Sequence, residues 1–119
     1  MNELYSKDQK EHLRLIEESA RDFAEKNIRP HVMEWDEAQK FPVPLFKKMG
    51  KMGFMGILVP EELGGSGLGY HEYIAVVEEI SKVDASASVC LSVNNSLVCW
   101  GLEKFGTEEQ KQKYLTPLA

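Results

Sequence analysis

Cysteine is scarce in this chain of 119 residues, where Cys90 and Cys99 are the only two. If both lie on one helix, their side chains point about 180° apart, because each residue turns a helix by about 100°. The sequence therefore excludes a local disulfide framework and is typical of a reducing compartment. We expect both thiols to be buried and inert.

Dense positive charge is also lacking. The net charge is −5, and the densest basic group is Lys47, Lys48 and Lys51. Nucleic acids and anionic membranes select proteins with larger Lys and Arg clusters, which release counterions or meet lipid headgroups. The three lysines are instead typical of the solvated face of a short amphipathic helix. We therefore expect no nucleic acid and no membrane among the partners.

Targeting signals are not evident at the N-terminus. Residues Met1 to Tyr5 lack both the apolar stretch of a secretion signal and the Arg-rich character of a transit peptide, so we expect a cytoplasmic protein. The segment from Ala85 to Leu102 is uncharged, but it contains serines and asparagines that are costly in lipid. We expect this segment to be a buried core helix.

Metal-ligand and nucleophile patterns are missing as well. His12, His31 and His71 lie in separate segments, without a second ligand at the spacing of a metal site, and no nucleophile elbow is present. The adjacent carboxylates Glu61-Glu62 and Glu78-Glu79 point in different directions on a helix, so they do not form a facing acid–base pair. We interpret both pairs as solvated faces.

Helix signals, by contrast, follow one another along the whole chain. Capping boxes at Ser6 and Thr107, and an N-cap at Asp84, predict three helix starts, and Pro44 suits the first turn of another. The predicted helices run from Ser6 to about Arg29, from His31 to Ala38, from Pro44 to about Met49, from His71 to Lys82, from Asp84 to Phe105 and from Thr107 toward Leu115. The sequence thus predicts one all-α domain, residues 1–119, with about six helices in an orthogonal or up-down bundle.

The segment between the third and fourth helices is rich in glycine. An apolar extended piece is expected over Phe54 to Val59, followed by the loop Gly64 to Gly69. Glycines at a helix start can bring backbone N–H groups close to a phosphate, but no strand–turn–helix unit surrounds this loop. The pattern favours a surface turn over a phosphate site.

The helix after Asp84 is apolar on two opposed sides. Its apolar residues fall into two groups on opposite sides of the helix, the first of them within an arc of about 80°. This pattern predicts that the helix is buried on both sides. The groups are Val89, Val93, Leu97 and Trp100 on one side, and Leu91, Val98, Leu102 and Phe105 on the other. Polar residues interrupt this pattern from Ser92 to Ser96, and they either tie the core to a neighbouring segment or line a cavity.

Several segments, in this order and spacing, resemble the acyl-CoA dehydrogenase family. They are Arg21–Ala24, Phe41-Pro42, Met49–Phe54, Val59–Gly67, Glu78–Ile80 and Lys104–Lys111. The stretch from Ser92 to Leu97 is most similar to the short-chain, butyryl-CoA branch. The resemblance extends over essentially the whole chain.

This resemblance implies the helical N-terminal domain of a three-domain oxidoreductase, without the FAD-binding β domain and the C-terminal helical bundle. The family oxidises an acyl-CoA to the trans-2-enoyl-CoA, and an electron-transfer flavoprotein collects the electrons. The catalytic glutamate lies in the C-terminal bundle, so no catalytic, cofactor-binding or metal residue is expected here. The resemblance also implies a homo-oligomer at full length and an inactive chain when this domain is alone.

The family's matching helix supplies part of the wall of the acyl-chain cavity. By position, the resemblance assigns this role to Val89, Cys90, Val93, Asn94 and Leu97. Trp100-Gly101 departs from the pattern, and a kink at this interior glycine would reshape the wall. The alternative is a freestanding, non-catalytic helical module for binding or assembly.

Overall fold

The computed structural model describes residues 4–119, and these residues form helices and loops but no strands. Met1 to Glu3, part of the segment considered for targeting signals, lie outside the described residues. The fold class predicted from the sequence is confirmed. No helix in residues 4–119 combines the length and the apolar character needed to cross a membrane.

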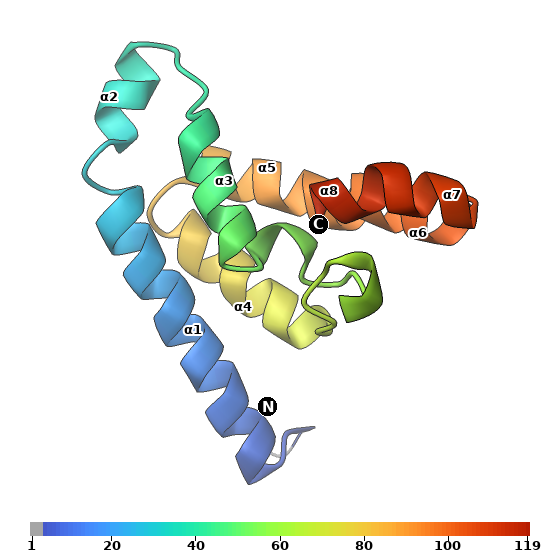
Figure 1. Cartoon of the computed structure of the whole chain (residues 1–119). Helices are drawn as coiled ribbons and strands as arrows, with labels where there is room; N and C mark the ends of the chain where they lie inside the picture. The colour runs from blue at the N-terminus through green and yellow to red at the C-terminus, as the bar shows by residue number, and fades with distance from the viewer. Residues whose placement is uncertain (1–3) are drawn as a thin grey trace.

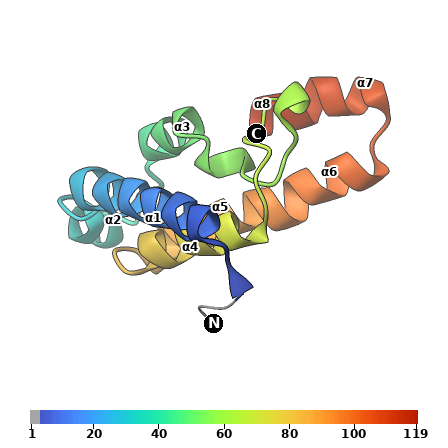
Figure 2. The same cartoon turned by 90° about the horizontal axis from the view of Figure 1, so that it is seen from below.

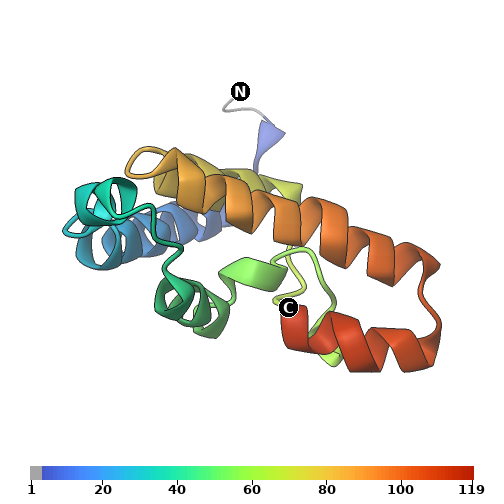
Figure 3. The same ribbon diagram turned by 90° about the horizontal axis from the view of Figure 1, so that it is seen from above.

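Two long helical rods, the helices between them and a C-terminal return make up the molecule (Figures 1 and 2). The first rod, α1, lies beside α4, and a second rod, formed by α5, η4 and α6, leads to a hairpin through which α7, η5 and α8 return (Figure 3). The bounds are α1 Lys7–Asn27, α2 Val32–Glu37, α3 Val43–Lys51, η2 Phe54–Gly56, η3 Glu61–Leu63, α4 Tyr70–Ser81, α5 Ala85–Val93, η4 Asn94–Cys99, α6 Trp100–Phe105, α7 Glu108–Gln110, η5 Lys111–Leu115 and α8 Thr116–Leu118.

The predicted caps begin the helices as expected. Gln9 N donates to Ser6 Oγ over 3.2 Å, and Ser6 N donates to Gln9 Oε1 over 2.8 Å, which completes the capping box of α1. Thr107 and Gln110 form the same reciprocal pair before α7, and Asp84 caps α5. Each cap satisfies backbone N–H groups that have no partner inside the helix.

The prediction of an extended piece at residues 54–59 is wrong. Phe54–Gly56 is a 3-10 helix that follows Gly53, whose φ of 81° is left-handed, and a turn closes where Val59 N donates to Gly56 O over 3.3 Å. No neighbouring strand pairs with this apolar stretch in residues 4–119, so its backbone groups bond locally and to the side chains of Asn94 and Asn95.

The core has two parts, one at each end of the second rod. The larger part packs α1, α3, α4 and the start of α5 together, with Ile28, Met49, Ile80 and Leu91 fully enclosed. The smaller part joins η3, η4 and η5 through Val59, Leu63, Cys99 and Leu115.

The prediction that the second rod is buried on both sides is also wrong. Leu91 and Cys99 are fully enclosed, but Val89, Leu97 and Phe105 are 60%, 67% and 74% exposed. Val89 and Leu97 belong to one predicted apolar group and Phe105 to the other, so both groups contain side chains that no element in residues 4–119 covers. An apolar pattern indicates what a helix can bury, not whether the same chain supplies the cover.

The two cysteines differ from each other. Both are free, as expected, but Cys90 is half-buried and only Cys99 is fully buried. Burial raises the pKa of the Cys99 thiol to about 11, so at neutral pH it is protonated and a poor nucleophile. The expectation of a buried, inert thiol is confirmed for Cys99, whereas Cys90 is more accessible than expected.

Glu79 contradicts the interpretation of its carboxylate as solvated. It is 4% exposed, and it accepts hydrogen bonds from Arg21 Nε (3.2 Å), Arg21 Nη2 (3.1 Å) and Lys82 Nζ (2.9 Å). Adjacent residues point in different directions on a helix, so Glu78 stays in solvent while Glu79 turns toward α1. Arg21 and Glu79 belong to two of the segments that resemble the family, and the structure joins them.

Glu79→Gln should lower the free energy of unfolding by about 1–2 kcal/mol at pH 7, because it removes charge-assisted bonds from a partly solvated Arg21. Hydrogen bonds from Arg21 hold the pKa of Glu79 below its ordinary value, with Lys82 adding to the effect and burial opposing it. A carboxyl with a depressed folded-state pKa stabilises the fold above its unfolded pKa and loses that effect as pH falls.

Urea unfolding at several pH values tests this prediction. The difference between wild type and Glu79→Gln should shrink below about pH 4. Glu78→Gln is the matched control, since Glu78 is 63% exposed and should change stability little. A Glu79→Gln effect that is the same at every pH would contradict the ionic role.

Candidate functional site

The five residues assigned to an acyl wall lie on one side of α5 and η4 in two adjacent rows. Val89, Val93 and Leu97, which we call the outer row, are 60%, 40% and 67% exposed. Cys90 and Asn94, the inner row, are half-buried. Residues four positions apart share a helix face, which explains both rows. The structure therefore brings the five residues together, and their role as a wall stays a prediction.

Asn95 anchors this wall to the segment below it. Its Oδ1 accepts from Ile57 N over 2.7 Å, and its Nδ2 donates to Phe54 O over 2.9 Å and to Leu91 O over 3.0 Å. The side chain is fully buried, so these bonds replace all contact with water. Of the two roles that the sequence left open for the buried amides, tying the core together is confirmed for Asn95.

Asn94 makes a second tie at the edge of the wall. Its Nδ2 donates to Met55 O over 2.7 Å and to Leu118 O over 3.0 Å, which connects η4 with η2 and α8. Sequence reasoning did not foresee Met55 and Leu118 as neighbours of the wall. They are 39 and 24 residues from Asn94, and helical periodicity carries no signal over such separations.

The wall contains a local irregularity, but upstream of the predicted position. Residues Asn94–Cys99 form a π turn, in which the backbone hydrogen bonds span one residue more than in an α-helix. Gly101, where a kink was expected, lies within α6, and its Cα faces open space. Leu97 thus projects from widened backbone, as residues at functional sites often do.

A hollow of about 440 Å³ opens at the N-terminal end of the wall. It lies between α2, the segment that leads to α3 and the first turn of α5, and Phe41, Phe46 and Ala87 form much of its apolar lining. Cys90 is the only one of the five predicted residues that lines it. The hollow therefore continues from the inner row, not from the outer row.

The glycine-rich loop does not fit a phosphate. Backbone N–H groups at four successive positions already donate to carbonyl oxygens of the chain, Gly65 to Pro60, Ser66 to Gly56, Gly67 to Val59 and Leu68 to Ile57, over 2.8–3.1 Å. A phosphate site needs such groups free and convergent. The N–H groups of this loop are used within the chain, so it is not suited to the diphosphate of a flavin.

Metal ligands do not gather either. Across the part of the chain that the structure describes, no group of three or more His, Cys, Asp or Glu side chains is placed to hold a metal ion. The candidate site is therefore an apolar surface with amide ties, and it has no acid–base machinery of its own. Such a surface can bind an apolar chain but cannot move a proton.

The protein-family model described as acyl-CoA dehydrogenase, N-terminal domain, matches residues 10–119 of this chain. The chain belongs to the acyl-CoA dehydrogenase family. It is 47% identical over 103 residues to the mitochondrial short-chain specific acyl-CoA dehydrogenase of Bos taurus, which covers 87% of this chain and 25% of the bovine protein. It is also 47% identical over 105 residues to the short-chain specific enzyme of Clostridium acetobutylicum, covering 88% and 28%.

Solved structures of this family's members agree. Butyryl-CoA dehydrogenase from Megasphaera elsdenii matches with a TM-score of 0.81 and 36% identity, over 89% of this chain and 28% of that one. A chain in the structure of the electron transferring flavoprotein of Acidaminococcus fermentans matches with a TM-score of 0.87 and 47% identity, over 97% and 29%. The chain spans about a quarter of the length of the curated relatives it matches.

Proposed function

We propose that this chain is the N-terminal domain of a flavin-dependent acyl-CoA dehydrogenase and forms part of its acyl-chain pocket. The observation that carries the proposal is the outer row. Val89, Val93 and Leu97 stay exposed on a helix whose opposite side is buried in the core. Leaving apolar side chains in water is unfavourable, so this row is suited to contact with an apolar chain or a further domain.

The reaction proposed for the parent protein is the oxidation of a short-chain acyl-CoA to the trans-2-enoyl-CoA. A glutamate and an FAD group, both held by residues outside this chain, would supply the removal of the α proton and the acceptance of the β hydrogen as hydride. The residues of this chain bind and orient the acyl group and exclude water from it. The butyryl-CoA and short-chain names of the relatives support the choice of substrate.

The partners follow from the same proposal. The substrate is an acyl-CoA, and an electron-transfer flavoprotein accepts the electrons, as the match within the Acidaminococcus fermentans structure supports. The parent protein forms a homo-oligomer through regions beyond this domain. A cytoplasmic location belongs to this proposal too, although the bovine relative is named as mitochondrial.

Flavin bleaching tests the proposal. FAD and butyryl-CoA are added to the 119-residue chain and to a longer protein that carries the chain followed by the flavin and C-terminal domains. Loss of oxidised-flavin absorbance is expected only with the longer protein, because the acid–base and flavin-binding residues lie outside this chain. Bleaching by the short chain, or none by either, would overturn the proposal.

Leu97→Ala in the longer protein should shift the preference toward longer acyl-CoA substrates by several-fold. The change removes carbon atoms from the wall, and each methylene of substrate that fills the space contributes about 0.8 kcal/mol. The measurement is kcat/KM across a series of acyl chain lengths. Val98→Ala is the matched control, because Val98 is 40% exposed and adjacent but lies outside the wall. An unchanged profile for Leu97→Ala would remove Leu97 from the wall.

A further inference from the structure

A second hollow, of about 290 Å³, lies where α1 ends and α3 begins. Its lining comes from three separate segments: the last turn of α1, the region around α2 and the first turns of α3. The lining residues are Lys26, Asn27, His31, Trp35, Lys40, Pro42, Pro44, Leu45 and Lys48. Only Trp35 and two residues of the α2–α3 connection, Lys40 and Pro42, also line the larger hollow near Cys90. The acyl wall does not contribute to it.

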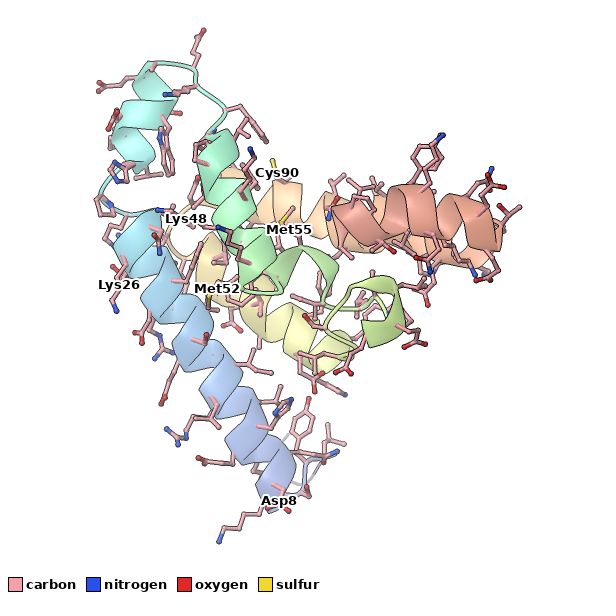
Figure 4. All side chains as sticks on the ribbon, in the orientation of Figure 1. Asp8, Lys26, Lys48, Met52, Met55 and Cys90 are labelled. Atoms are coloured by element: carbon pink, nitrogen blue, oxygen red, sulfur yellow. The ribbon has the colours of Figure 1, made fainter. Side chains whose placement is uncertain are left out.

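Three exposed lysines line this hollow. Lys26, Lys40 and Lys48 line it, and the lining contains no carboxylate, although the chain as a whole has a net charge of −5. Figure 4 labels Lys26 on α1 and Lys48 on α3. None of the three belongs to an ion pair of the described residues.

Neighbouring groups do not neutralise the positive charge of the three lysines. Lys48 Nζ donates to Asn27 Oδ1 over 3.4 Å, a neutral contact that orients the ammonium group without neutralising it. His31, which also lines the hollow, lies beside Glu34, whose carboxylate is 3.5 Å from His31 Nδ1 and is 72% exposed. A carboxylate that exposed is well solvated and weakens the local field only slightly.

The partial charges of the two helix ends at the hollow offset each other. The C-terminal end of α1 carries about half a negative charge, and the N-terminal end of α3 carries about half a positive charge. Their sum is close to zero, so the three lysines decide the sign of the potential. Ammonium groups are point charges that suit phosphate, and several of them suit a phosphate group better than a singly charged carboxylate.

An apolar surface adjoins the lysines. The imidazole of His31 stacks on the indole of Trp35, with ring centroids 5.4 Å apart and an angle of 29° between the planes. Pro42, Pro44 and Leu45 extend this surface along the hollow. Rings and prolines lose little side-chain freedom on binding, so they suit the flat or apolar body of a ligand.

We propose that this hollow binds an organic phosphate, with the phosphate group on Lys26, Lys40 and Lys48 and the body of the ligand against Trp35. The site is separate from the acyl wall, and it does not depend on the dehydrogenase activity. The ligand class is a nucleoside phosphate, or a similar molecule in which phosphate groups with two or more negative charges are attached to a ring system.

Titration of the 119-residue chain tests the proposal. The indole N–H signal of Trp35 is followed by NMR, assigned with Trp100→Phe, while pyrophosphate, ADP or adenosine is added. Pyrophosphate and ADP should shift this signal saturably, ADP at lower concentration, and adenosine should not. Each lysine contact is worth roughly fivefold in affinity at the surface, so the triple variant Lys26→Gln, Lys40→Gln, Lys48→Gln should bind ADP more than tenfold more weakly.

A matched variant separates a site from general charge. Lys47→Gln removes the same charge from the same helix but lies outside the hollow, and it should leave ADP affinity within about twofold, because exposed charges at a distance are screened by salt. No saturable shift with either phosphate, or equal losses for Lys47→Gln and Lys48→Gln, would overturn the proposal. Equal affinities for pyrophosphate and ADP would overturn the role given to Trp35.

Discussion

Gly65→Ala is expected to destabilise the chain by about 3 kcal/mol or more, among the largest effects of a single methyl group in this fold. A Cβ at Gly65 would lie 2.1 Å from Val59 O and 2.4 Å from Val59 Cβ. Val59 cannot move aside easily, because its carbonyl also accepts from Gly67 N over 2.8 Å and its side chain is buried. The added methyl group must therefore displace backbone.

Gly101→Ala is the matched comparison. Gly101 lies inside α6, and a Cβ there meets nothing within 4 Å. Alanine is about 0.8–1 kcal/mol more favourable than glycine inside a helix, so this substitution should raise the midpoint of urea unfolding of the 119-residue chain. Gly65→Ala should lower it or abolish the transition. Equal midpoints for the two variants would show that the close approach at Gly65 is relieved at no cost.

Asn95→Asp should destabilise the chain by about 3 kcal/mol at pH 7, although the two side chains have nearly the same shape. The new carboxylate would still accept from Ile57 N, but it would face Phe54 O and Leu91 O, which now accept from Nδ2. Two donor contacts would become repulsive ones inside a fully buried site, where an unpaired charge is costly.

The pH dependence identifies the cause. Burial and the two carbonyl oxygens would raise the folded-state pKa of the new carboxyl above its unfolded value, so the penalty should be greatest at neutral pH and diminish as pH falls toward about 4. Ser96→Ala is the neighbouring control, because Ser96 Oγ only donates to Ser92 O within the same rod. Its effect should stay below about 1 kcal/mol. A constant Asn95→Asp penalty would contradict the electrostatic explanation.

Local chemistry made the helix boundaries predictable. The caps at Ser6, Asp84 and Thr107 involve atoms two or three residues apart, so the sequence contains the whole signal. The ion pair between Arg21 and Glu79 joins residues 58 positions apart, and nothing in the spacing of the carboxylates indicated it. Contacts of that kind depend on which helices pack together, which single-sequence patterns do not specify.

The candidate site was predictable only in part. Resemblance to a family assigned five residues to an acyl-chain wall; the structure places them on one side of the second rod, and their role as a wall stays a prediction. Their exposure was not predictable, because an apolar pattern is the same whether the cover comes from this chain or from elsewhere. The basic hollow was not predictable either, since Lys26, Lys40 and Lys48 come from three segments whose convergence depends on the packing of α1 against α3.

The π turn at Asn94–Cys99 bears on how this wall can vary through evolution. Losing one residue from a regular helix rotates everything downstream by about 100°, which would bring polar faces into the core. Losing one residue from the π turn restores regular α geometry instead, so the half-buried Leu102 of α6 keeps its place against the smaller core and only Leu97 and its neighbours change direction. A single residue can therefore be gained or lost at this position. Such a change alters the contour of the wall while the rest of the domain stays folded.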